Sequence, residues 1–331
     1  MSNPQDNYSI GAGQGRKPTG IVAILGPTAS GKSAIAHRLA MATAGEIVSC
    51  DSMQVYRGLE IGTAQPTTTE RNEVPYHLTG ELDFTIPWNA HKHKIEVLKR
   101  IEKIHERGNP AFLVGGTGMY AKTILYDLPM QPADSKEYAK IFKIASSEDG
   151  RLELLHEIET TAPSFSIPPD LVANPRRLAR AVEVLRVSGS IPDNFGAMSE
   201  TRVLAPRPDS AQFILLPPPD EHRERIRKRT ETMLESGWIE EVESLCKRGF
   251  FESPTARQAL GYARIREFLD GEIESRETLL DRIVADTWKY ARRQRTWFRH
   301  QHPGAYLLTL RKNVSVDALS QAILATVERK F

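Results

Sequence analysis

The octapeptide Gly26-Pro27-Thr28-Ala29-Ser30-Gly31-Lys32-Ser33 constrains the fold of this chain more than any other segment. It matches the phosphate-binding pattern G-x-x-x-x-G-K-S/T, which needs a strand before it and a helix after it. Both flanks fit, because the apolar run Ile21–Leu25 predicts a strand and Ala34–Ala44 predicts a helix. Glycines let the backbone wrap an anion, and the helix N-terminus adds positive potential. The segment therefore predicts a site for a phosphorylated ligand.

Two side chains of this loop indicate how such a ligand is held. Lys32 can place a point charge on the terminal phosphates. The Ser33 hydroxyl can bind a magnesium ion, which prefers oxygen ligands. We therefore expect Mg²⁺ to accompany the phosphates.

Composition indicates an ordinary globular protein. The 331 residues allow two domains, or one domain with an insertion, and 40% of them are hydrophobic and 26% charged. A net charge of +2 excludes a uniformly basic nucleic-acid-binding surface, so such binding would need local patches. Residues 1–19 lack the hydrophobic segment of a secretion signal, and no apolar run could cross a bilayer. We expect a cytoplasmic protein with no membrane or obligate protein partner, and nothing demands more than a monomer.

Cysteine and histidine positions do not predict a metal site. Cys50 and Cys246 have no C-x-x-C or histidine partner nearby, so we expect buried, reduced thiols. His91 and His93 lie at a predicted helix start without further ligands, which favours solvated or core-edge positions.

Strands and helices alternate along the chain. Further strands are predicted at Glu46–Cys50, Ala111–Val114, Gln212–Leu216 and Tyr306–Leu310, and a helix at Ala90–Arg107. The alternation predicts an α/β fold of the P-loop NTPase type, with a parallel sheet and helices on both faces. A small all-helical insertion completes the predicted architecture.

Asp51 and Thr117 each follow a predicted strand directly, as the phosphate loop does. Ligands of open parallel sheets bind outside the carboxyl ends of the strands, so these three segments are expected to meet around the phosphates. Asp51 could act in catalysis, cap the next segment or hold magnesium. Thr117 could serve the chemistry or satisfy its own turn. The residues alone leave these alternatives open.

The chain is expected to divide into four segments. Residues 1–19 form a flexible tail, 20–133 the first part of the P-loop core, 134–205 the helical insertion, and 206–331 the rest of the core with basic C-terminal helices. In the insertion, Asn174-Pro175 indicates a helix start, and the arginines that follow favour a solvated face on spacing alone. Tyr290–His300 mixes arginines with aromatics, as RNA-binding segments do, although an amphipathic helix with Tyr290 and Trp297 in the core has the same pattern.

Over residues from about 20 to 300, the chain resembles the tRNA dimethylallyltransferases, also called tRNA isopentenyltransferases. The phosphate loop is shared with many proteins, whereas the ordered set of further motifs is highly specific. These motifs are Asp51-Ser52-Met53-Gln54-Val55-Tyr56, Ile61-Gly62-Thr63-Ala64, Pro75-Tyr76-His77-Leu78, Val114-Gly115-Gly116-Thr117-Gly118-Met119-Tyr120, Arg180-Ala181-Val182-Glu183-Val184, Gln258-Ala259-Leu260-Gly261-Tyr262 and Arg292-Arg293-Gln294-Arg295-Thr296-Trp297-Phe298-Arg299.

The resemblance implies transfer of a dimethylallyl group from dimethylallyl diphosphate to N6 of adenosine 37, in tRNAs reading codons that begin with U. Mg²⁺ would be the cofactor, and the tRNA anticodon stem-loop the macromolecular partner. Asp51 would be the general base, with Thr117 bonded near the reacting centre. Ser33 would bind the metal, with Asp51 as a second candidate ligand.

The resemblance also implies two sets of binding residues. The diphosphate would be held by Gly26, Pro27, Thr28, Ala29, Ser30, Gly31, Lys32 and Ser33, with Arg225 and Arg229 as further candidates. The tRNA would be contacted by Asp51, Ser52, Met53, Gln54, Thr117, Arg176, Arg177, Leu178, Ala179, Arg180, Gln258, Gly261, Tyr262, Arg292, Arg293, Gln294, Arg295, Thr296, Trp297 and Arg299. The insertion would then face the tRNA.

The chain departs from the family pattern at three places. Tyr138 stands where the family usually has an arginine, Arg176 replaces a glutamine, and Trp288 replaces an arginine. These changes bear on RNA docking and leave the residues of the chemistry intact.

Three other functions fit parts of the sequence. A P-loop kinase would use ATP as donor, with the insertion as a lid. An adenylate isopentenyltransferase would use free AMP or ATP as acceptor, and the basic and aromatic C-terminal third argues against it because a free nucleotide needs no such surface. An inactive RNA-binding protein would have lost Asp51, Lys32 or Thr117, all of which are present.

Overall fold

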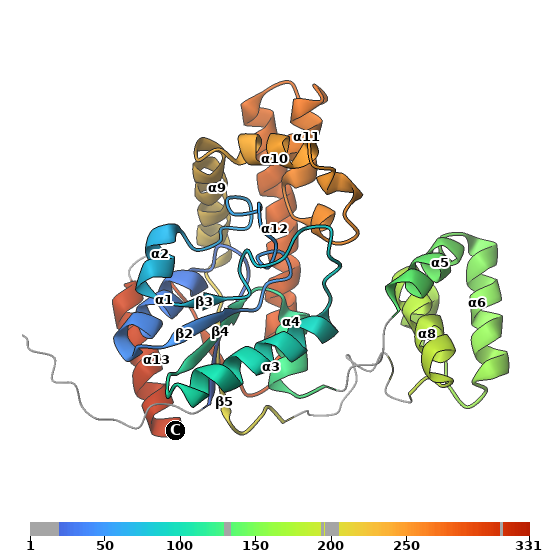
Figure 1. Ribbon diagram of the computed structural model, residues 1–331, viewed down its shortest axis with the longest axis horizontal. Coiled ribbons are helices and arrows are strands. Elements are labelled where there is room, and N and C mark those ends of the chain that lie inside the picture. Colours follow the sequence, from blue (N-terminus) through green and yellow to red (C-terminus); the bar gives the residue numbers. More distant parts are fainter. Residues whose placement is uncertain (1–19, 129–133, 193–194, 196–204, 312–313) are drawn as a thin grey trace, which may run out of the picture. The chain divides into compact units, whose positions relative to one another are not determined.

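The computed structural model describes residues 20–128, 134–192, 195, 205–311 and 314–331. Within them the chain forms two compact units, one from residues 20–128 and 205–331 and the other within residues 129–204 (Figure 1). The tail predicted at residues 1–19 lies outside the described residues.

The larger unit is built on a parallel sheet, which confirms the predicted α/β fold. The described strands are ordered β3-β2-β4-β1-β5-β6, and every paired neighbour is parallel. The two-residue strand β3 is too short to be recognised from alternation, and the sequence did not predict it. The strands are β1 Ile21–Leu25, β2 Glu46–Ser49, β3 Tyr76–His77, β4 Ala111–Gly115, β5 Ser210–Leu215 and β6 Tyr306–Leu308.

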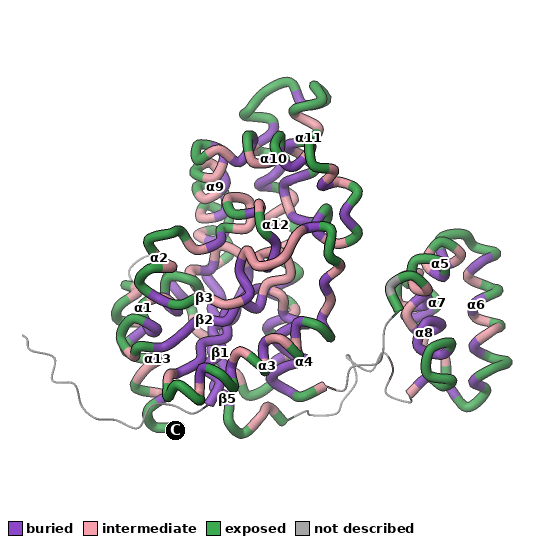
Figure 2. Tube along the Cα trace, in the orientation of Figure 1, coloured by how far each residue is buried: buried purple, intermediate pink, exposed green. Residues whose placement is uncertain are grey.

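Helices cover both faces of this sheet, as predicted. Helices α1 and α13 pack against one face through a core that includes Ile35, Leu39 and Ile323, and α3 and α4 lie on the other face (Figure 1). The central strands are buried along their whole length (Figure 2), because apolar runs covered on both faces leave no residue in water. The helices are α1 Lys32–Thr43, α2 Thr68–Glu73, α3 Ala90–Glu106, α4 Gly118–Leu125, α9 Pro219–Glu235, α10 Trp238–Cys246, α11 Tyr262–Leu269, α12 Arg276–Gln301 and α13 Val316–Lys330, with short 3₁₀ turns η1 Phe250–Glu252 and η2 Ala256–Gln258.

In its described residues, the smaller unit has helices joined by loops and no strand. Its helices are α5 Ser135–Ala145, α6 Glu148–Thr161, α7 Pro169–Ala173 and α8 Pro175–Ser188. They enclose a core of their own that includes Ile141, Leu154, Leu178 and Leu185. The predicted start of α8 is confirmed, since the Asn174 side chain accepts a hydrogen bond from Arg176 N at 3.1 Å.

Cysteine and histidine predictions are confirmed in part. Cys50 is buried, whereas Cys246 is half-buried at the end of α10, so the expectation for Cys246 was wrong. His93 is buried against Tyr120, and His91 is exposed. No helix among the described residues is long and apolar enough to span a membrane.

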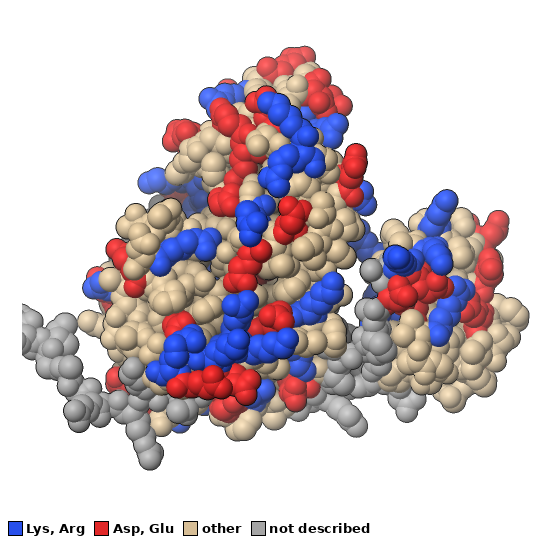
Figure 3. Space-filling view, viewed as in Figure 1, with Lys and Arg blue, Asp and Glu red and all other residues tan. Residues whose placement is uncertain are grey.

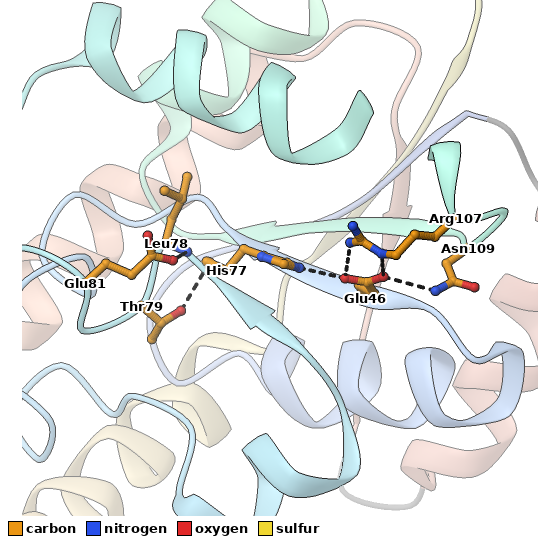
Figure 4. Close-up of polar contacts among 7 residues, drawn as sticks. All are labelled: Glu46, His77, Leu78, Thr79, Glu81, Arg107 and Asn109. Carbon is orange, nitrogen blue, oxygen red and sulfur yellow. Dashed lines mark hydrogen bonds and ion pairs between the residues drawn. The ribbon is translucent and has the colours of Figure 1, made fainter. Parts of the chain in front are cut away.

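A buried carboxylate joins three segments at the start of β2 (Figure 4). Glu46 is 3% exposed and accepts hydrogen bonds from Arg107 at 2.8 and 2.9 Å and from Asn109 at 3.0 Å, and it lies 2.7 Å from His77 Nε2. Burial alone would raise the pKa of this carboxyl group. The hydrogen bonds outweigh burial and lower the pKa of Glu46 to about 2.

We expect Glu46 to make the stability of the larger unit depend on acid pH. Because the folded pKa lies below the ordinary value, the ionised group stabilises the fold above about pH 4.5, and this stabilisation is lost as the pH falls toward 2. Its full size is on the order of 3 kcal/mol, from 1.36 kcal/mol per pKa unit. Urea unfolding of Glu46→Gln should show a deficit against wild type that shrinks as the pH falls from 7 to 3. Glu243→Gln, which removes an exposed pair with Lys247, is the control and should show almost no deficit.

Candidate functional site

The phosphate loop starts α1 with a left-handed glycine. Gly31 has φ 89°, and an added Cβ atom would lie 2.8 Å from Leu310 Cδ2, so only glycine fits there. The N–H groups of the first helical turn have no partner within the helix and point away from its N-terminus. Together with the helix dipole, they form an anion-binding site.

A pocket of about 290 Å³ lies at this helix start. The loop and α9 line it together, which brings residues 29–33 of the predicted phosphate loop and both predicted arginines to one place, whereas residues 26–28 do not line it. Its lining residues are Ala29, Ser30, Gly31, Lys32, Ser33, Ala34, Arg225 and Arg229. Arg225 is partly engaged, since it donates to Leu310 O at 3.2 Å and lies 3.7 Å from the Glu221 carboxylate.

Two half-buried cations, Lys32 and Arg229, lie close together in this pocket, and Asp51 offsets only part of their unfavourable burial. Burial, and secondarily the neighbouring Arg229, lower the pKa of Lys32 to about 8, although Asp51 opposes the shift. Burial also lowers the pKa of Arg229, again opposed by Asp51. A bound anion would relieve this repulsion, so the pocket is suited to a multiply charged phosphate ligand.

Asp51 and Thr117 lie side by side at the carboxyl ends of β2 and β4. Ser52 N donates to Thr117 Oγ1 at 3.1 Å, and Thr117 N donates to Cys50 O at 3.3 Å. Asp51 Oδ1 accepts from Met53 N at 2.9 Å, and its charge acts on Lys32 and Arg229. The structure therefore brings the carboxylate, the hydroxyl and the phosphate loop to one edge, while their chemical roles stay a prediction.

The long helix α12 has two different faces at this edge. Arg292, Arg293, Thr296 and Arg299 are exposed. The first three of these residues border an open groove of about 730 Å³, which is lined by Lys289, Arg292, Arg293, Thr296, Trp297, His300 and Gln301. Trp297 is half-buried against Gly118, so the helix is amphipathic as one alternative predicted, although Tyr290 and Trp297 lie at the edge of the core, and RNA binding by this segment stays a prediction.

The inner face of α12 holds the site loops. Gln294 Oε1 accepts from Thr28 N at 2.9 Å, and Gln294 Nε2 donates to Gly116 O at 2.8 Å. Arg295 donates to Pro217 O at 2.5 Å and lies 3.5 Å from His222 Nδ1. His222 Nε2 in turn lies 2.7 Å from Thr28 O. Sequence reasoning missed His222 altogether, because a histidine in a charged helix carries no signal of what it faces.

Several residues implied as tRNA contacts are buried in this structure, so their side chains pack within the protein. Their contact with tRNA stays a prediction. Tyr262 is fully buried and donates to Glu241 at 2.7 Å, while Gly261 packs on Trp238. The buried set is Leu178, Ala179, Gly261, Tyr262, Gln294 and Arg295.

The remaining residues implied as tRNA contacts differ in solvent exposure and in their hydrogen bonds within the protein. Gln258 and Arg176 are exposed, whereas Arg180 is half-buried and pairs with Glu183 at the base of α8. The Gln54 amide is bonded to Ser49 Oγ at 2.8 Å and to the carbonyl groups of Thr63 and Ala64. Gln54 therefore shapes its own loop. Ser52, Met53 and Arg177 are half-buried.

Tyr290, which the sequence offered either as an RNA-stacking aromatic or as a core residue, lies near the candidate site. It is half-buried on α12, and the Arg293 guanidinium lies 5.8 Å from its ring centroid. Burial raises the pKa of Tyr290 to about 12, with a further contribution from the Asp51 charge. Its phenol therefore stays neutral and lies close to Asp51.

The pocket offers the Ser33 hydroxyl as a ligand suited to a magnesium ion. In the described part of the chain, no three histidine, cysteine or acidic side chains lie close enough to hold a metal. Ser33 is exposed and borders the phosphate pocket. Mg²⁺ commonly keeps several waters and binds phosphate oxygens, so one hydroxyl beside a diphosphate fits this ion.

Fold and site together define a P-loop protein with an anion pocket beside a basic helix. The IPP transferase family model matches residues 54–301, and an isopentenyl transferase model matches residues 19–76. The tRNA dimethylallyltransferase of Corynebacterium efficiens is 36% identical over 85% of this chain and 92% of its own length, and that of Myxococcus xanthus 35% identical over 90% and 95%. The chain therefore belongs to the IPP transferase family.

Solved structures agree with this assignment. The tRNA isopentenylpyrophosphate transferase of Bacillus halodurans aligns with a TM-score of 0.65 and 31% identity, covering 95% of this chain and 98% of that one. A eukaryotic dimethylallyltransferase acting on tRNA aligns with a TM-score of 0.73 and 25% identity, covering 92% and 77%. The predicted family resemblance is thus confirmed.

We expect Lys32 to make anion binding fall at alkaline pH. An anion binds the ammonium form, so affinity for inorganic pyrophosphate should be level up to about pH 8 and then decrease as Lys32 loses its proton. Calorimetric titration between pH 6.5 and 9.5 measures this. Lys32→Met should bind pyrophosphate more weakly, and its affinity should not show the decrease that is due to Lys32. Because pyrophosphate itself titrates equally in both experiments, the difference between wild type and variant reports Lys32 alone. A decrease of equal size in Lys32→Met would contradict the assignment.

Proposed function

We propose that this protein transfers a dimethylallyl group from dimethylallyl diphosphate to N6 of adenosine 37 in tRNAs that read codons beginning with U. The single observation that carries the proposal is the meeting of the cationic phosphate pocket with Asp51 and Thr117 at one sheet edge, beside exposed arginines of α12. Family membership supports the same activity. We further propose that the protein acts in the cytoplasm and as a monomer.

The donor is expected to bind with its diphosphate at the start of α1. Backbone N–H groups of Gly31 and Lys32, the Lys32 ammonium and Arg229 surround that position. Negative charge grows on the diphosphate as the bond to the allylic carbon breaks, and fixed donors in a partly desolvated pocket stabilise such charge strongly. A bound Mg²⁺, held by Ser33, would add charge stabilisation of the same kind.

The acceptor amine is a weak nucleophile because its lone pair is delocalised into the adenine ring. Asp51 is therefore assigned the amine proton, a role that typically contributes about 10²–10⁴-fold. Thr117 is assigned a hydrogen bond beside the reacting atoms. The tyrosine at position 290, neutral and near Asp51, offers a flat surface for a base or for the allyl group.

The RNA is expected to bind the exposed side of α12. Arginine forks suit phosphates, and the target base must leave its stack, which costs a few kcal/mol. Exposed Arg176 at the start of α8 and exposed Gln258 are proposed as further contacts, which gives the smaller unit an RNA-binding role. On the larger unit, basic and acidic side chains alternate over the face drawn in Figure 3, so contacts there would be local.

Labelled donors test the proposed function directly. The protein is incubated with bulk tRNA and either labelled dimethylallyl diphosphate or labelled ATP, and label in tRNA nucleosides is identified by mass spectrometry. Label from dimethylallyl diphosphate on N6 of adenosine is expected. Label from ATP on a small metabolite, with none from the prenyl donor, would favour a P-loop kinase. Label on free AMP rather than tRNA would favour an adenylate isopentenyltransferase.

We expect Asp51→Asn to lower kcat by about 10²–10⁴-fold. The amide keeps the size of the side chain but does not take the amine proton at neutral pH. Single-turnover rates and tRNA binding by fluorescence anisotropy separate the two effects, and tRNA affinity should change by less than about threefold because it depends mainly on phosphate contacts. A loss of tRNA binding equal to the loss of rate would assign Asp51 to docking.

A further inference from the structure

One side-chain amide joins the two loops that form the candidate site. Gln294, on the inner face of α12, is 7% exposed. Its oxygen accepts from Thr28 N of the phosphate loop at 2.9 Å, and its nitrogen donates to Gly116 O of the β4–α4 loop at 2.8 Å. These loops leave neighbouring parallel strands, since Leu25 pairs with Gly115. The amide thus spans the gap between them.

Only glutamine satisfies both bonds at this position. One end of the side chain must accept from an N–H group and the other must donate to a carbonyl group. A glutamate would place a second oxygen against Gly116 O, and an apolar side chain would leave one buried and one partly buried backbone group without these partners. Gly116 is fitted to the contact, because an added Cβ atom would lie 2.7 Å from Gln294 Nε2.

The Thr28 backbone is held from its other side as well. His222 of α9 is fully buried, and its Nε2 lies 2.7 Å from Thr28 O. Burial lowers the pKa of His222, so the ring is neutral with its proton on Nε2, and Nδ1 faces the Arg295 guanidinium at 3.5 Å. Both polar backbone groups of Thr28 are therefore used within the protein. The Thr28 N–H group is engaged by Gln294 and is not directed to a phosphate.

The hydrogen bond from Gln294 to Gly116 lies next to the residues assigned to catalysis. Thr117 follows Gly116 directly, and its hydroxyl accepts from Ser52 N, next to Asp51. A shift of the β4–α4 loop would therefore move Thr117 and the Asp51 segment relative to the phosphate pocket. Misplacement of about 1 Å can cost on the order of 10²-fold in rate.

We propose that Gln294 is a positioning residue that sets the phosphate loop at a fixed distance from the Thr117 loop. This replaces the tRNA contact that the family resemblance implied for it. The proposal rests on the proposed function. Exposed Arg293, one residue earlier on the same helix, belongs to the solvent-exposed side that is proposed to bind the RNA.

Gln294→Ala tests this with three measurements on the full chain. Calorimetry with inorganic pyrophosphate should give an affinity about tenfold lower, because two backbone groups lose their partner and the loop loosens. Steady-state kinetics should show a lower kcat and a higher KM for dimethylallyl diphosphate. The affinity for a tRNA transcript, measured by anisotropy, should stay within about twofold, since few phosphate contacts change. Arg293→Ala should show the reverse, with weaker tRNA binding and unchanged pyrophosphate affinity.

Two further variants separate positioning from loss of stability. Gln212→Ala also removes a buried glutamine, one that accepts from Tyr126 at 3.3 Å in the middle of β5, and should lower the melting temperature without changing pyrophosphate affinity. Gln294→Glu keeps the bond from Thr28 and loses that to Gly116, so kcat should stay low at a melting temperature close to that of wild type, whereas a merely structural role would lower kcat only together with the melting temperature.

The outcomes are distinct. Weaker tRNA binding by Gln294→Ala at unchanged pyrophosphate affinity would make Gln294 an RNA contact and overturn the proposal. Equal loss of pyrophosphate affinity in Gln212→Ala would also overturn it, as a general effect of destabilisation. Failure of the wild-type protein to transfer a prenyl group would contradict the proposed function, whereas the pyrophosphate measurements need no turnover and still decide the role of Gln294.

Discussion

The hydrogen bonds to Thr28 connect the sheet, the phosphate loop and the long C-terminal helix. Thr28 N is bound by Gln294 of α12 and Thr28 O by His222 of α9. Neither helix belongs to the strand–loop–helix unit that carries the phosphate motif. The shape of the loop therefore depends on residues nearly two hundred or more positions further along the chain, and the larger unit closes its site only when its N-terminal and C-terminal parts have packed together.

This arrangement explains how positive charge can be kept in a partly buried pocket. Burial lowers the pKa of both Lys32 and Arg229, which means that the fold disfavours their charged forms. Asp51 offsets part of that cost, and a diphosphate would offset more. The carboxylate expected to take a proton from the acceptor thus also stabilises the cations that hold the donor. The carboxylate assigned to the acceptor and the cations assigned to the donor are therefore electrostatically coupled. Removal of Asp51 would further disfavour the charged forms of Lys32 and Arg229.

Local sequence predicted the core of the fold well because its signals are short-range. The apolar runs of β1 and β4 and the glycine pattern at Gly31 are complete within a few residues, and the sheet follows from parallel packing. Strand β3 has two residues and no periodicity, so it was missed. The convergence of Asp51 and Thr117 followed from topology alone. Their hydrogen bonds did not, since Thr117 bonds across a distance of 65 residues.

The basic segment of α12 shows where sequence reasoning reaches its limit. Arg292, Arg293, Arg295 and Arg299 look equivalent in a run of arginines and aromatics, yet Arg295 is 8% exposed and bonded to Pro217 O. Successive residues of an α-helix are about 100° apart, so a run of arginines spreads around the helix, and which face is inner depends on what packs against it.

That ambiguity has a physical origin. An arginine can serve a buried carbonyl group or a solvated phosphate with the same guanidinium, because both are hydrogen-bond acceptors. A glutamine can likewise bridge two backbone segments or read a base. Composition therefore identifies α12 as polar and basic without separating the residues that build the site from those that face its substrate. Only the partners at Thr28, Gly116 and Pro217 make that separation, and they lie on three other elements of the fold.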